Sequence, residues 1–310
     1  MIVGQVLGLT ACLLVSASTS SAKQPYVLVL GVAQDAGYPQ AGTKESSAWK
    51  DHSLRRKAAC LAIVDPVSGQ RWLFEATPDF KDQLHLLDEA APHPQRPGLA
   101  GIFLTHGHMG HYSGLIHLGR EAIGAKSVPV YAMPRMKKFL ETNGPWELLV
   151  RLKNIEIRPM QTERVVSLSA NLKVRPFLVP HRDEYTETVG YEIIGPKKRV
   201  LFIPDIDKWE KLDTQGVKIE KLIRKVDVAF IDGTFYAEGE IPGRAMSEIP
   251  HPFIAETMTR FSKRSKVFKS KVHFIHLNRT NPALNQNGKA AQEIRKRGFR
   301  LAEPMQRVGL

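Results

Sequence analysis

Three of the eleven histidines, His106, His108 and His111, fall within one stretch of six residues. They follow an apolar run at residues 99–104, which predicts a buried strand, and they precede a segment of helical character at residues 113–122. Such a junction is where α/β proteins commonly place their chemistry. Neutral imidazole is the commonest protein ligand for zinc-like metals, and His-x-His places two of them on one extended loop. The stretch therefore predicts a metal site that the rest of the chain must complete.

Composition allows one large α/β domain. The chain has 310 residues, of which 43% are hydrophobic and 24% charged, as is ordinary for a globular protein with a substantial core. It contains two cysteines, Cys12 and Cys60. If Cys12 leaves with an N-terminal signal, Cys60 stands alone and forms no internal disulfide. Its apolar surroundings predict a buried thiol.

The formal net charge of +13 comes from basic clusters that are scattered along the chain. No nucleic-acid-binding motif accompanies them, so a solvated surface is the favoured interpretation and no nucleic-acid partner is expected. The partner that we expect is a small-molecule substrate, and the charge leaves room for an anionic one. The oligomeric state is not indicated.

The first 22 residues carry no charged side chain and resemble a secretory signal peptide. Residues 6–17 are mostly apolar, and Ser20 and Ala22 are small residues suited to cleavage before Lys23. We therefore expect a signal peptide at 1–22, a single domain at 23–310, and an exported protein, periplasmic or secreted. A lipid-anchored form through Cys12 is less favoured, because the apolar stretch continues past it. No stable membrane span is expected, because a span needs about 20 predominantly apolar residues.

Strands and helices are predicted from periodicity and turn residues. The principal strands are predicted at residues 26–33, 59–64, 71–74, 99–104, 128–132, 174–181, 189–194, 199–203, 228–231 and 272–275. Helices are predicted at residues 80–87, 134–142, 145–153, 217–226, 252–261 and 288–296. Two sheets with helices on the outside fit this order. A doubly wound parallel sheet fits less well, because it would need a Gly-x-Gly-x-x-Gly turn and fewer consecutive strands.

Three further polar residues end apolar strands: His181, Asp205 and His276. A polar side chain at a strand end lies at the edge of its sheet, where ligands from distant segments can converge. Together with the histidine stretch they make five histidines and one carboxylate. That set is sufficient for one or two zinc ions per chain, and iron or manganese are alternatives.

In this order, the histidine stretch, His181, Asp205 and His276 resemble the metallo-β-lactamase-fold hydrolases. Residues 31–40 and 231–236 are more narrowly similar to the branch that contains the pyrroloquinoline-quinone biosynthesis protein B. The resemblance implies an α/β (α+β) fold, an αββα sandwich of two mixed β-sheets with metals at one edge. It implies that His106, His108 and His181 hold a first metal. It also implies that His111 and His276 hold a second one, with Asp205 bridging.

One position departs from the family motif His-x-His-x-Asp-His, because Gly110 stands where the motif has aspartate. Three interpretations stay open. A carboxylate from elsewhere substitutes, with Asp35 as the first candidate and Asp207 as the second. Alternatively, the site holds one metal only, bound by His106, His108 and His181. In the third interpretation catalysis is lost and the pocket only binds.

The function that the resemblance implies is a metal-dependent hydrolase of an ester, amide or phosphoester, using a metal-activated water. Asp205, Asp35 and His251 are the candidate catalytic residues. The alternatives are an oxidoreductase or carrier of the pyrroloquinoline-quinone biosynthesis type, and a non-catalytic binding protein on the same fold. In that branch a cysteine-containing zinc element can follow the first glycine-rich loop. Residues 41–47 contain no cysteine, so no structural zinc is expected there.

Five other residues are weaker candidates. Tyr112 could donate a hydrogen bond to substrate or simply pack, and Arg182 could hold an anionic group or remain solvated. Asp183 and Glu184 could orient a metal-bound imidazole or lie on the surface, and Asp232 could do the same or order a turn. No site role is assigned to the remaining histidines, which are His52, His85, His93, His117 and His273.

Overall fold

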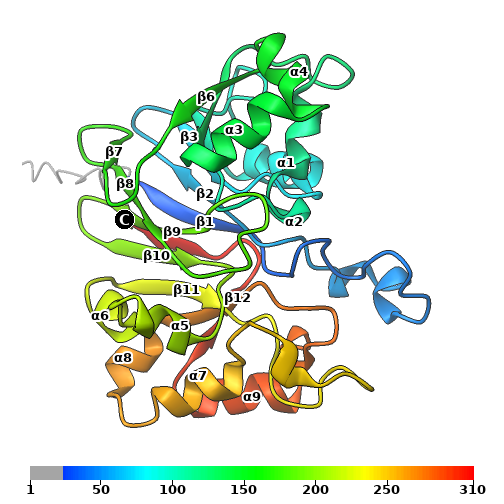
Figure 1. Cartoon of the computed structure of the whole chain (residues 1–310), viewed down its shortest axis with the longest axis vertical. Helices are drawn as coiled ribbons and strands as arrows, with labels where there is room; N and C mark the ends of the chain where they lie inside the picture. The colour runs from blue at the N-terminus through cyan, green and yellow to red at the C-terminus, as the bar shows by residue number, and fades with distance from the viewer. Residues whose placement is uncertain (1–23) are drawn as a thin grey trace, which may run out of the picture.

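The computed structural model describes residues 24–310, so the signal peptide expected at 1–22 lies outside the described residues. Within this range two seven-stranded sheets lie at the centre, and helices cover the outer face of each (Figure 1). The predicted αββα arrangement is therefore confirmed.

The first sheet has the strand order β14-β1-β2-β3-β4-β5-β6. Its strands are β1 (Tyr26–Gly31), β2 (Cys60–Val64), β3 (Arg71–Phe74), β4 (Gly101–Phe103), β5 (Val128–Ala132), β6 (Ile155–Pro159) and β14 (Arg307–Gly309). From β3 to β6 neighbouring strands pair in parallel, and the other pairs are antiparallel.

The second sheet repeats this mixture in the order β13-β12-β11-β10-β9-β8-β7. Its strands are β7 (Val166–Ser167), β8 (Lys173–Leu178), β9 (Val189–Ile194), β10 (Arg199–Ile203), β11 (Val228–Asp232), β12 (Val272–Ile275) and β13 (Arg300–Leu301). From β10 to β13 the pairs are parallel, so successive carboxyl ends meet at one edge.

The helices follow the parallel part of each sheet. Beside the first sheet lie α1 (Phe80–Ala90), α2 (Met109–Tyr112), η3 (Ser113–Leu118), α3 (Pro134–Thr142) and α4 (Trp146–Arg151). Beside the second lie α5 (Trp209–Thr214), α6 (Ile219–Arg224), η4 (Met246–Glu248), α7 (Ile254–Arg260), α8 (Lys266–Ser270), η5 (Pro282–Leu284) and α9 (Lys289–Lys296). The short helices α5 and α8 were not predicted.

Alternating apolar residues explain how each sheet is covered on both faces. In β1, Leu28 and Leu30 pack beneath the helices, whereas Val27 and Val29 face the space between the sheets. This is the two-residue period of a strand. Between the sheets, Phe74 stacks on Phe103 at a ring-centroid distance of 5.0 Å. Burial on both faces holds the two sheets together and fixes the positions of their strand ends.

Residues 113–122 were predicted to be helical, and the structure is different there. The helix α2 begins inside the histidine stretch and gives way to the 3₁₀ helix η3. Backbone hydrogen bonds tie this segment to the end of β3, because Ala76 N donates to His111 O and Gly114 N donates to Ala76 O. A regular helix would not keep both bonds, so the loop is held in its own shape.

Between β1 and β2, the segment at residues 34–57 extends away from the body of the molecule, at the right of Figure 1. It contains the 3₁₀ turns η1 (Ser47–Trp49) and η2 (His52–Leu54). No helix in the described part of the chain combines the length and apolar character that a bilayer crossing requires.

Candidate metal centre

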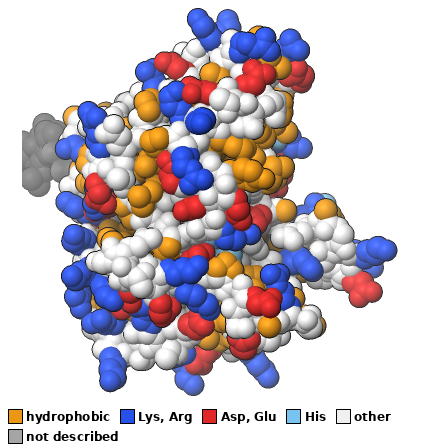
Figure 2. Space-filling model, viewed as in Figure 1, with side chains coloured by type: hydrophobic (Ala, Val, Ile, Leu, Met, Phe, Trp, Pro, Cys, Tyr) orange, Lys and Arg blue, Asp and Glu red, His pale blue; other side chains and the backbone are white. Residues whose placement is uncertain are grey.

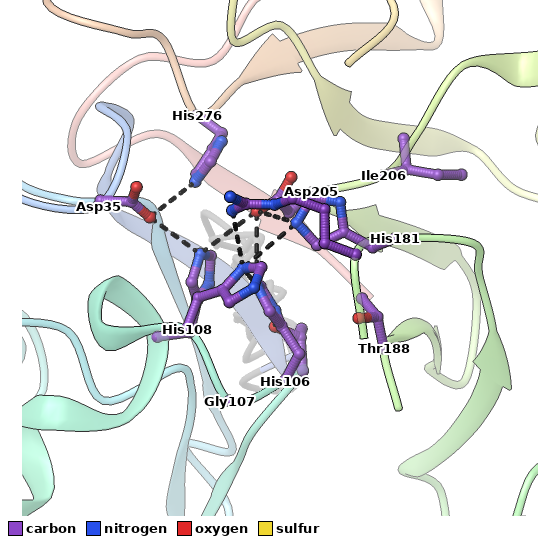
Figure 3. Close-up of polar contacts among 12 residues, drawn as sticks. Asp35, His106, Gly107, His108, His181, Thr188, Asp205, Ile206 and His276 are labelled. Carbon is purple, nitrogen blue, oxygen red and sulfur yellow. Dashed lines mark hydrogen bonds and ion pairs between the residues drawn. The ribbon is translucent and has the colours of Figure 1, made fainter. Parts of the chain in front are cut away.

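The loops that follow β1, β4, β8, β10 and β12 meet at one edge of the sandwich. The β1 end is joined to the β12 end by backbone bonds, since Gln34 N donates to Leu277 O and Leu277 N donates to Val32 O, each at 2.9 Å. These contacts bridge the two sheets. They place Asp35, which follows β1, beside His276, which follows β12 (Figure 3).

A first cluster contains His106, His108, His181 and Asp205. His108 Nδ1 lies 2.8 Å from His106 Nε2 and 3.2 Å from His181 Nε2. Asp205 Oδ2 lies 3.5 Å from His106 Nε2 and 3.2 Å from His181 Nε2. Four tetrahedral ligands with bonds of about 2.0 to 2.2 Å are separated from one another by about 3.3 to 3.6 Å. The donor set and its spacing therefore fit a zinc-like ion.

A second cluster contains Asp35, His111 and His276. Asp35 Oδ1 lies 3.3 Å from His111 Nε2 and 3.7 Å from His276 Nε2. The Nε2 atoms of both histidines are buried and have no hydrogen-bond partner among residues 24–310. Buried polar atoms without partners are costly, and here they face a carboxylate across a short gap. These donors fit a second cation.

Asp205 connects the two clusters. Its Oδ2 atom, which faces His106 and His181, also lies 3.7 Å from His111 Nε2 of the second cluster. The Asp205 side chain is almost completely buried between the clusters. One carboxylate is thus in reach of both groups of histidines.

Gly110 explains how Asp35 reaches the second cluster. A Cβ atom built on Gly110 would lie 2.4 Å from Asp35 Oδ1, 2.5 Å from its Cα and 2.7 Å from its Cβ. No side chain fits at position 110 while Asp35 is where it is. The carboxylate that position 110 lacks is supplied, in the same space, by a residue from the loop after β1. Asp207, the other candidate for this role, is not placed to fill it.

Asp207 instead lies behind the first cluster. Its Oδ1 is 3.1 Å from His181 Nδ1, and its Oδ2 accepts a hydrogen bond of 2.6 Å from Lys211 Nζ. Glu184 has a similar position, with Oε2 at 2.7 Å from His108 Nε2. Each carboxylate holds the ring nitrogen that points away from the cluster, which leaves the other nitrogen available to a metal.

Hydroxyl groups orient two more imidazoles. Thr105 Oγ1 lies 2.8 Å from His106 Nδ1, and Thr234 Oγ1 lies 2.9 Å from His276 Nδ1. In both cases Nε2 is the nitrogen that faces its cluster. These threonines were not predicted, although Thr105 directly precedes the first histidine.

Glu75 is a further supporting residue that the sequence did not point to. It lies just after β3, is completely buried, and has Oε1 at 3.4 Å from His111 Nδ1. Its backbone is in the left-handed region, with φ of 84°. A glutamate that directly follows the apolar run of β3 was the available signal, because a charge at that position needs a partner.

His251 belongs to a third group, with Asp205 and Asp232. Its Nδ1 lies 2.9 Å from Asp232 Oδ2 and 3.2 Å from Asp205 Oδ1. Asp232 also accepts from the backbone N–H groups of Ile206 and Thr234, so it both orders its turn and holds the His251 ring. The loop before α7 thus brings a buried imidazole to the side of the first cluster.

Ionisation favours metal ligation. Burial raises the pKa of Asp205, but His181 and His251 outweigh it and hold that pKa well below the usual range. Burial also raises the pKa of Asp35, but the His111 and His276 imidazoles that face its carboxylate outweigh burial and lower the pKa strongly. Both central carboxylates are therefore ionised at neutral pH, as ligands must be.

Two histidines of the first cluster differ in basicity. Burial, together with charge on His111, lowers the pKa of His106 well below its usual range. Burial also lowers the pKa of His181, but Asp205 and Asp207 outweigh it and raise that pKa to about 10. A cation bound here would compete with the proton on His181.

Most of the weaker candidates lie around the clusters rather than in them. Tyr112 is buried and donates to Met109 Sδ at 3.4 Å, so it packs. Arg182 is exposed, with one guanidinium nitrogen 3.2 Å from His108 Nδ1. Asp183 accepts from Thr188 Oγ1 at 2.9 Å. The five histidines without an assigned role take no part in the three groups of possible ligands.

Residues 70–277 match the family model described as the Beta-lactamase superfamily domain, which spans more than half of the chain. The chain belongs to the beta-lactamase superfamily. The resemblance stated from the motifs is therefore confirmed, and the clusters described above lie where strand ends of that fold meet.

Similarity to individual members of this superfamily extends over almost the whole chain. A "Coenzyme PQQ synthesis protein B" of Xanthomonas oryzae pv. oryzae (strain MAFF 311018) is 25% identical over 305 residues, covering 89% of this chain and 97% of that protein. The structure of Zn(2+)-bound PqqB from Methylobacterium extorquens superposes with a TM-score of 0.75 at 20% identity, covering 92% of this chain and 100% of that one. A diphosphatase from the PhnP family has a TM-score of 0.61 at 20% identity, with 93% and 97% covered.

Proposed function

We propose that the protein is a metal-dependent hydrolase that cleaves an ester, amide or phosphoester with a metal-activated water. The observation that carries this proposal is the pair of ligand clusters joined by Asp205, with buried imidazole nitrogens that have no other partner among the described residues. Membership of the beta-lactamase superfamily and the fold shared with a PhnP-family diphosphatase support it.

The first metal would be held by His106, His108, His181 and Asp205, and the second by Asp35, His111 and His276 with Asp205 between them. Zinc is the metal that this set of imidazole and carboxylate donors suits best, and iron and manganese accept the same donors. The similarity to a structure named as Zn(2+)-bound supports zinc. Of the three interpretations of Gly110, this assignment favours substitution by Asp35.

When bound, a zinc-like ion supplies Lewis-acid polarisation of a carbonyl or phosphoryl oxygen and a water whose pKa is lowered to about 7. The protein itself contributes a fixed array of donors, most of which are buried. Asp205 is oriented by His251 on one oxygen and faces the histidines with the other. The supporting contacts from Glu75 and Asp207 keep each ring at a defined angle.

His251 is suited to donate a proton to the leaving group. Burial lowers the pKa of His251, but Asp232 and Asp205 outweigh it and raise that pKa above its usual value. This shift favours the protonated ring, in which Nδ1 donates to Asp232 and lies 3.2 Å from Asp205 Oδ1, and Nε2 is the remaining donor. A positioned general acid of this kind typically accelerates a reaction by about 10²- to 10⁴-fold.

Metal analysis and hydrolysis assays test the proposal together. Protein purified without chelators should contain about two Zn, Fe or Mn ions per chain and should hydrolyse 4-nitrophenyl acetate or bis(4-nitrophenyl) phosphate. His106→Ala and His181→Ala should remove at least one ion and the activity, whereas His85→Ala, on an exposed face of α1, should do neither. Protein that binds no metal, and variants that behave as the wild type, would refute the proposal.

A second candidate is a step of quinone-cofactor synthesis, as an oxidoreductase or a carrier. Similarity to Coenzyme PQQ synthesis protein B over 89% of the chain favours it. Purification with iron, and oxygen consumption that depends on the iron, would support this candidate against hydrolysis. Metal binding without turnover in either assay would support the third alternative, a binding protein on the same fold.

A further inference from the structure

A hollow of about 340 Å³ lies beside the first cluster, between α3 and the loop that follows His181. The residues that line it include Arg135, Lys138, Phe139, Asn143, Glu184 and Tyr185. Its lining contains none of the candidate ligands, and among residues 24–310 Glu184 is the lining residue whose side chain forms a hydrogen bond or ion pair with one of them.

The hollow is joined to the candidate metal centre through two shared loops. Glu184 is part of its wall and also contacts His108 Nε2 at 2.7 Å. The neighbouring Asp183 carbonyl accepts a hydrogen bond of 3.0 Å from the Arg135 guanidinium, which fastens the loop to α3. In a complex, Glu184 would therefore lie between a molecule in the hollow and the candidate metal ligand His108.

One wall of the hollow is aromatic. The Phe139 and Tyr185 rings lie with centroids 5.7 Å apart, and Phe139 also packs edge-on against Tyr112 at 5.3 Å. Tyr185 is 65% exposed, and Met109 in the histidine stretch is 66% exposed. Figure 2 shows hydrophobic side chains gathered over the region where α2 and α3 lie. Exposed aromatic surface next to a polar site is suited to a planar apolar group.

Two cations, Lys138 and Arg135, line the same hollow, in which the acidic residue of the wall is Glu184. Among residues 24–310, no acidic side chain pairs with Lys138 or with the guanidinium of Arg135. The nearby carboxylates are engaged elsewhere, since Glu141 pairs with Lys137 and Glu187 accepts from the Arg135 backbone N–H. Charge of this kind beside an aromatic wall is suited to an anion.

We propose that this hollow binds an aromatic group bearing an anionic substituent, and that the substrate is an anionic aryl ester or phosphoester. This proposal rests on the proposed hydrolase function, because it assumes that the bond to be cleaved lies at the metal centre. The aromatic group lies against Phe139 and Tyr185, and the anionic group is held by Lys138 and Arg135. Glu184 lines the hollow and also contacts the candidate metal ligand His108. It therefore sets the distance between the bound aromatic group and the metal centre.

Binding of simple phosphonates tests the hollow independently of catalysis. Phenylphosphonate carries both features, methylphosphonate lacks the ring and phenol lacks the charge at neutral pH. Calorimetric titration of the full chain, after removal of metal with a chelator, should show phenylphosphonate binding about tenfold more tightly than either of the other two. Equal affinity for phenylphosphonate and methylphosphonate would overturn the aromatic part of the proposal.

Variants then assign the contacts. Lys138→Gln and Tyr185→Ala should each weaken phenylphosphonate binding about five- to tenfold, and Lys138→Arg should retain it. Lys266→Gln, an exposed change on α8 beside the other sheet, is the matched control and should bind as the wild type does. Unchanged affinity in both hollow variants would overturn the proposal.

The same proteins separate this proposal from the proposed function. Tight, variant-sensitive binding of phenylphosphonate without any hydrolysis by the metal-loaded protein would leave the hollow as assigned and refute the hydrolase. Hydrolysis of 4-acetoxybenzoate, an aryl ester whose carboxylate supplies the anionic substituent, with the same KM in wild type, Lys138→Gln and Tyr185→Ala would support the hydrolase and refute the hollow.

Discussion

At the scale of single residues, Gly110 and Asp35 depend on one another, because Asp35 occupies the space that a side chain at position 110 would need. A side chain at position 110 would overlap with Asp35, and Asp35 has its carboxylate beside His111 and His276. Its φ of 35° is unusual for a residue other than glycine, and such strain is found where function requires it. The pair acts as one structural unit that supplies a single carboxylate.

Asp35→Ala should lower the metal content from about two ions per chain to about one, because the second cluster would keep only two imidazoles and the shared Asp205. Elemental analysis after dialysis measures this directly. Asp51→Ala is the matched control, since Asp51 lies in the same extended segment and its carboxylate accepts hydrogen bonds from Ser53 rather than from a candidate ligand. Two ions retained in Asp35→Ala would remove Asp35 from the site.

The companion change Gly110→Asp tests whether the second cluster is limited by the space at position 110 or by the number of carboxylates. It introduces the aspartate of the family motif, yet it should reduce the second ion and destabilise the fold by about 1 to 3 kcal/mol, as overpacking does. An increase in metal content would show instead that Asp35 moves aside without loss.

His273 gives a pH-dependent prediction at a distance from the metal centre. Burial first, and then the charge of Arg300, lowers the pKa of His273 to about 4. The unfolded value is about 6.5, so between these values the unfolded chain binds more protons and the free energy of unfolding falls as the pH falls. Urea unfolding with chelator should show a loss between pH 7 and pH 4.5 that is about 2 kcal/mol greater in the wild type than in His273→Gln. Parallel losses in the two proteins would contradict this assignment.

At the scale of elements, the loop between η4 and α7 delivers His251 to the first cluster. If His251 protonates the leaving group, His251→Gln should lower kcat by about 10²- to 10⁴-fold for alkyl leaving groups and much less for 4-nitrophenolate, which leaves without a proton. A series of esters with leaving groups of rising pKa measures the difference. A uniform loss across the series would indicate that His251 only orients Asp205.

Much of the site could be predicted because polar residues at the ends of apolar strands lie at the edge of a sheet. His181, Asp205 and His276 end apolar runs, and parallel pairing of β10, β11 and β12 brings the last two to one edge. The location of Asp35 depends on hydrogen bonds between residues 32–34 and Leu277, a pairing that no local pattern encodes. Glu75 escaped prediction for a similar reason, because only the folded loop shows that its carboxylate faces His111.

At the scale of the whole molecule, the αββα arrangement could be predicted because both sheets carry the two-residue apolar period and their strands are followed by amphipathic helices. The strand order could not be predicted, because the C-terminal strand β14 returns to pair with β1. No local pattern in the sequence indicates that pairing. The same pairing anchors the chain end in the first sheet. At the edge that carries the site, the candidate ligands and the backbone bonds between residues 32–34 and Leu277 join the two sheets.

Metal should therefore stabilise the entire sandwich. Asp35, His106, His108 and His111 come from loops of the first sheet, and His181, Asp205 and His276 come from loops of the second. An ion present at 100 times its dissociation constant adds about 2.7 kcal/mol per site to the free energy of unfolding. For a chain of this size that corresponds to an increase in Tm of roughly 5 to 10 °C.

Thermal unfolding of one preparation, with excess zinc and then with chelator, measures this effect. The wild type should lose the increase in Tm when zinc is removed, because the ligands of the two sheets are then no longer held by a common ion. His181→Ala should lose most of the response to zinc, and His85→Ala, which changes an exposed residue of α1, should keep it. A wild-type Tm that is the same with zinc and with chelator would mean that the seven side chains do not bind a metal across the two sheets, whatever their spacing.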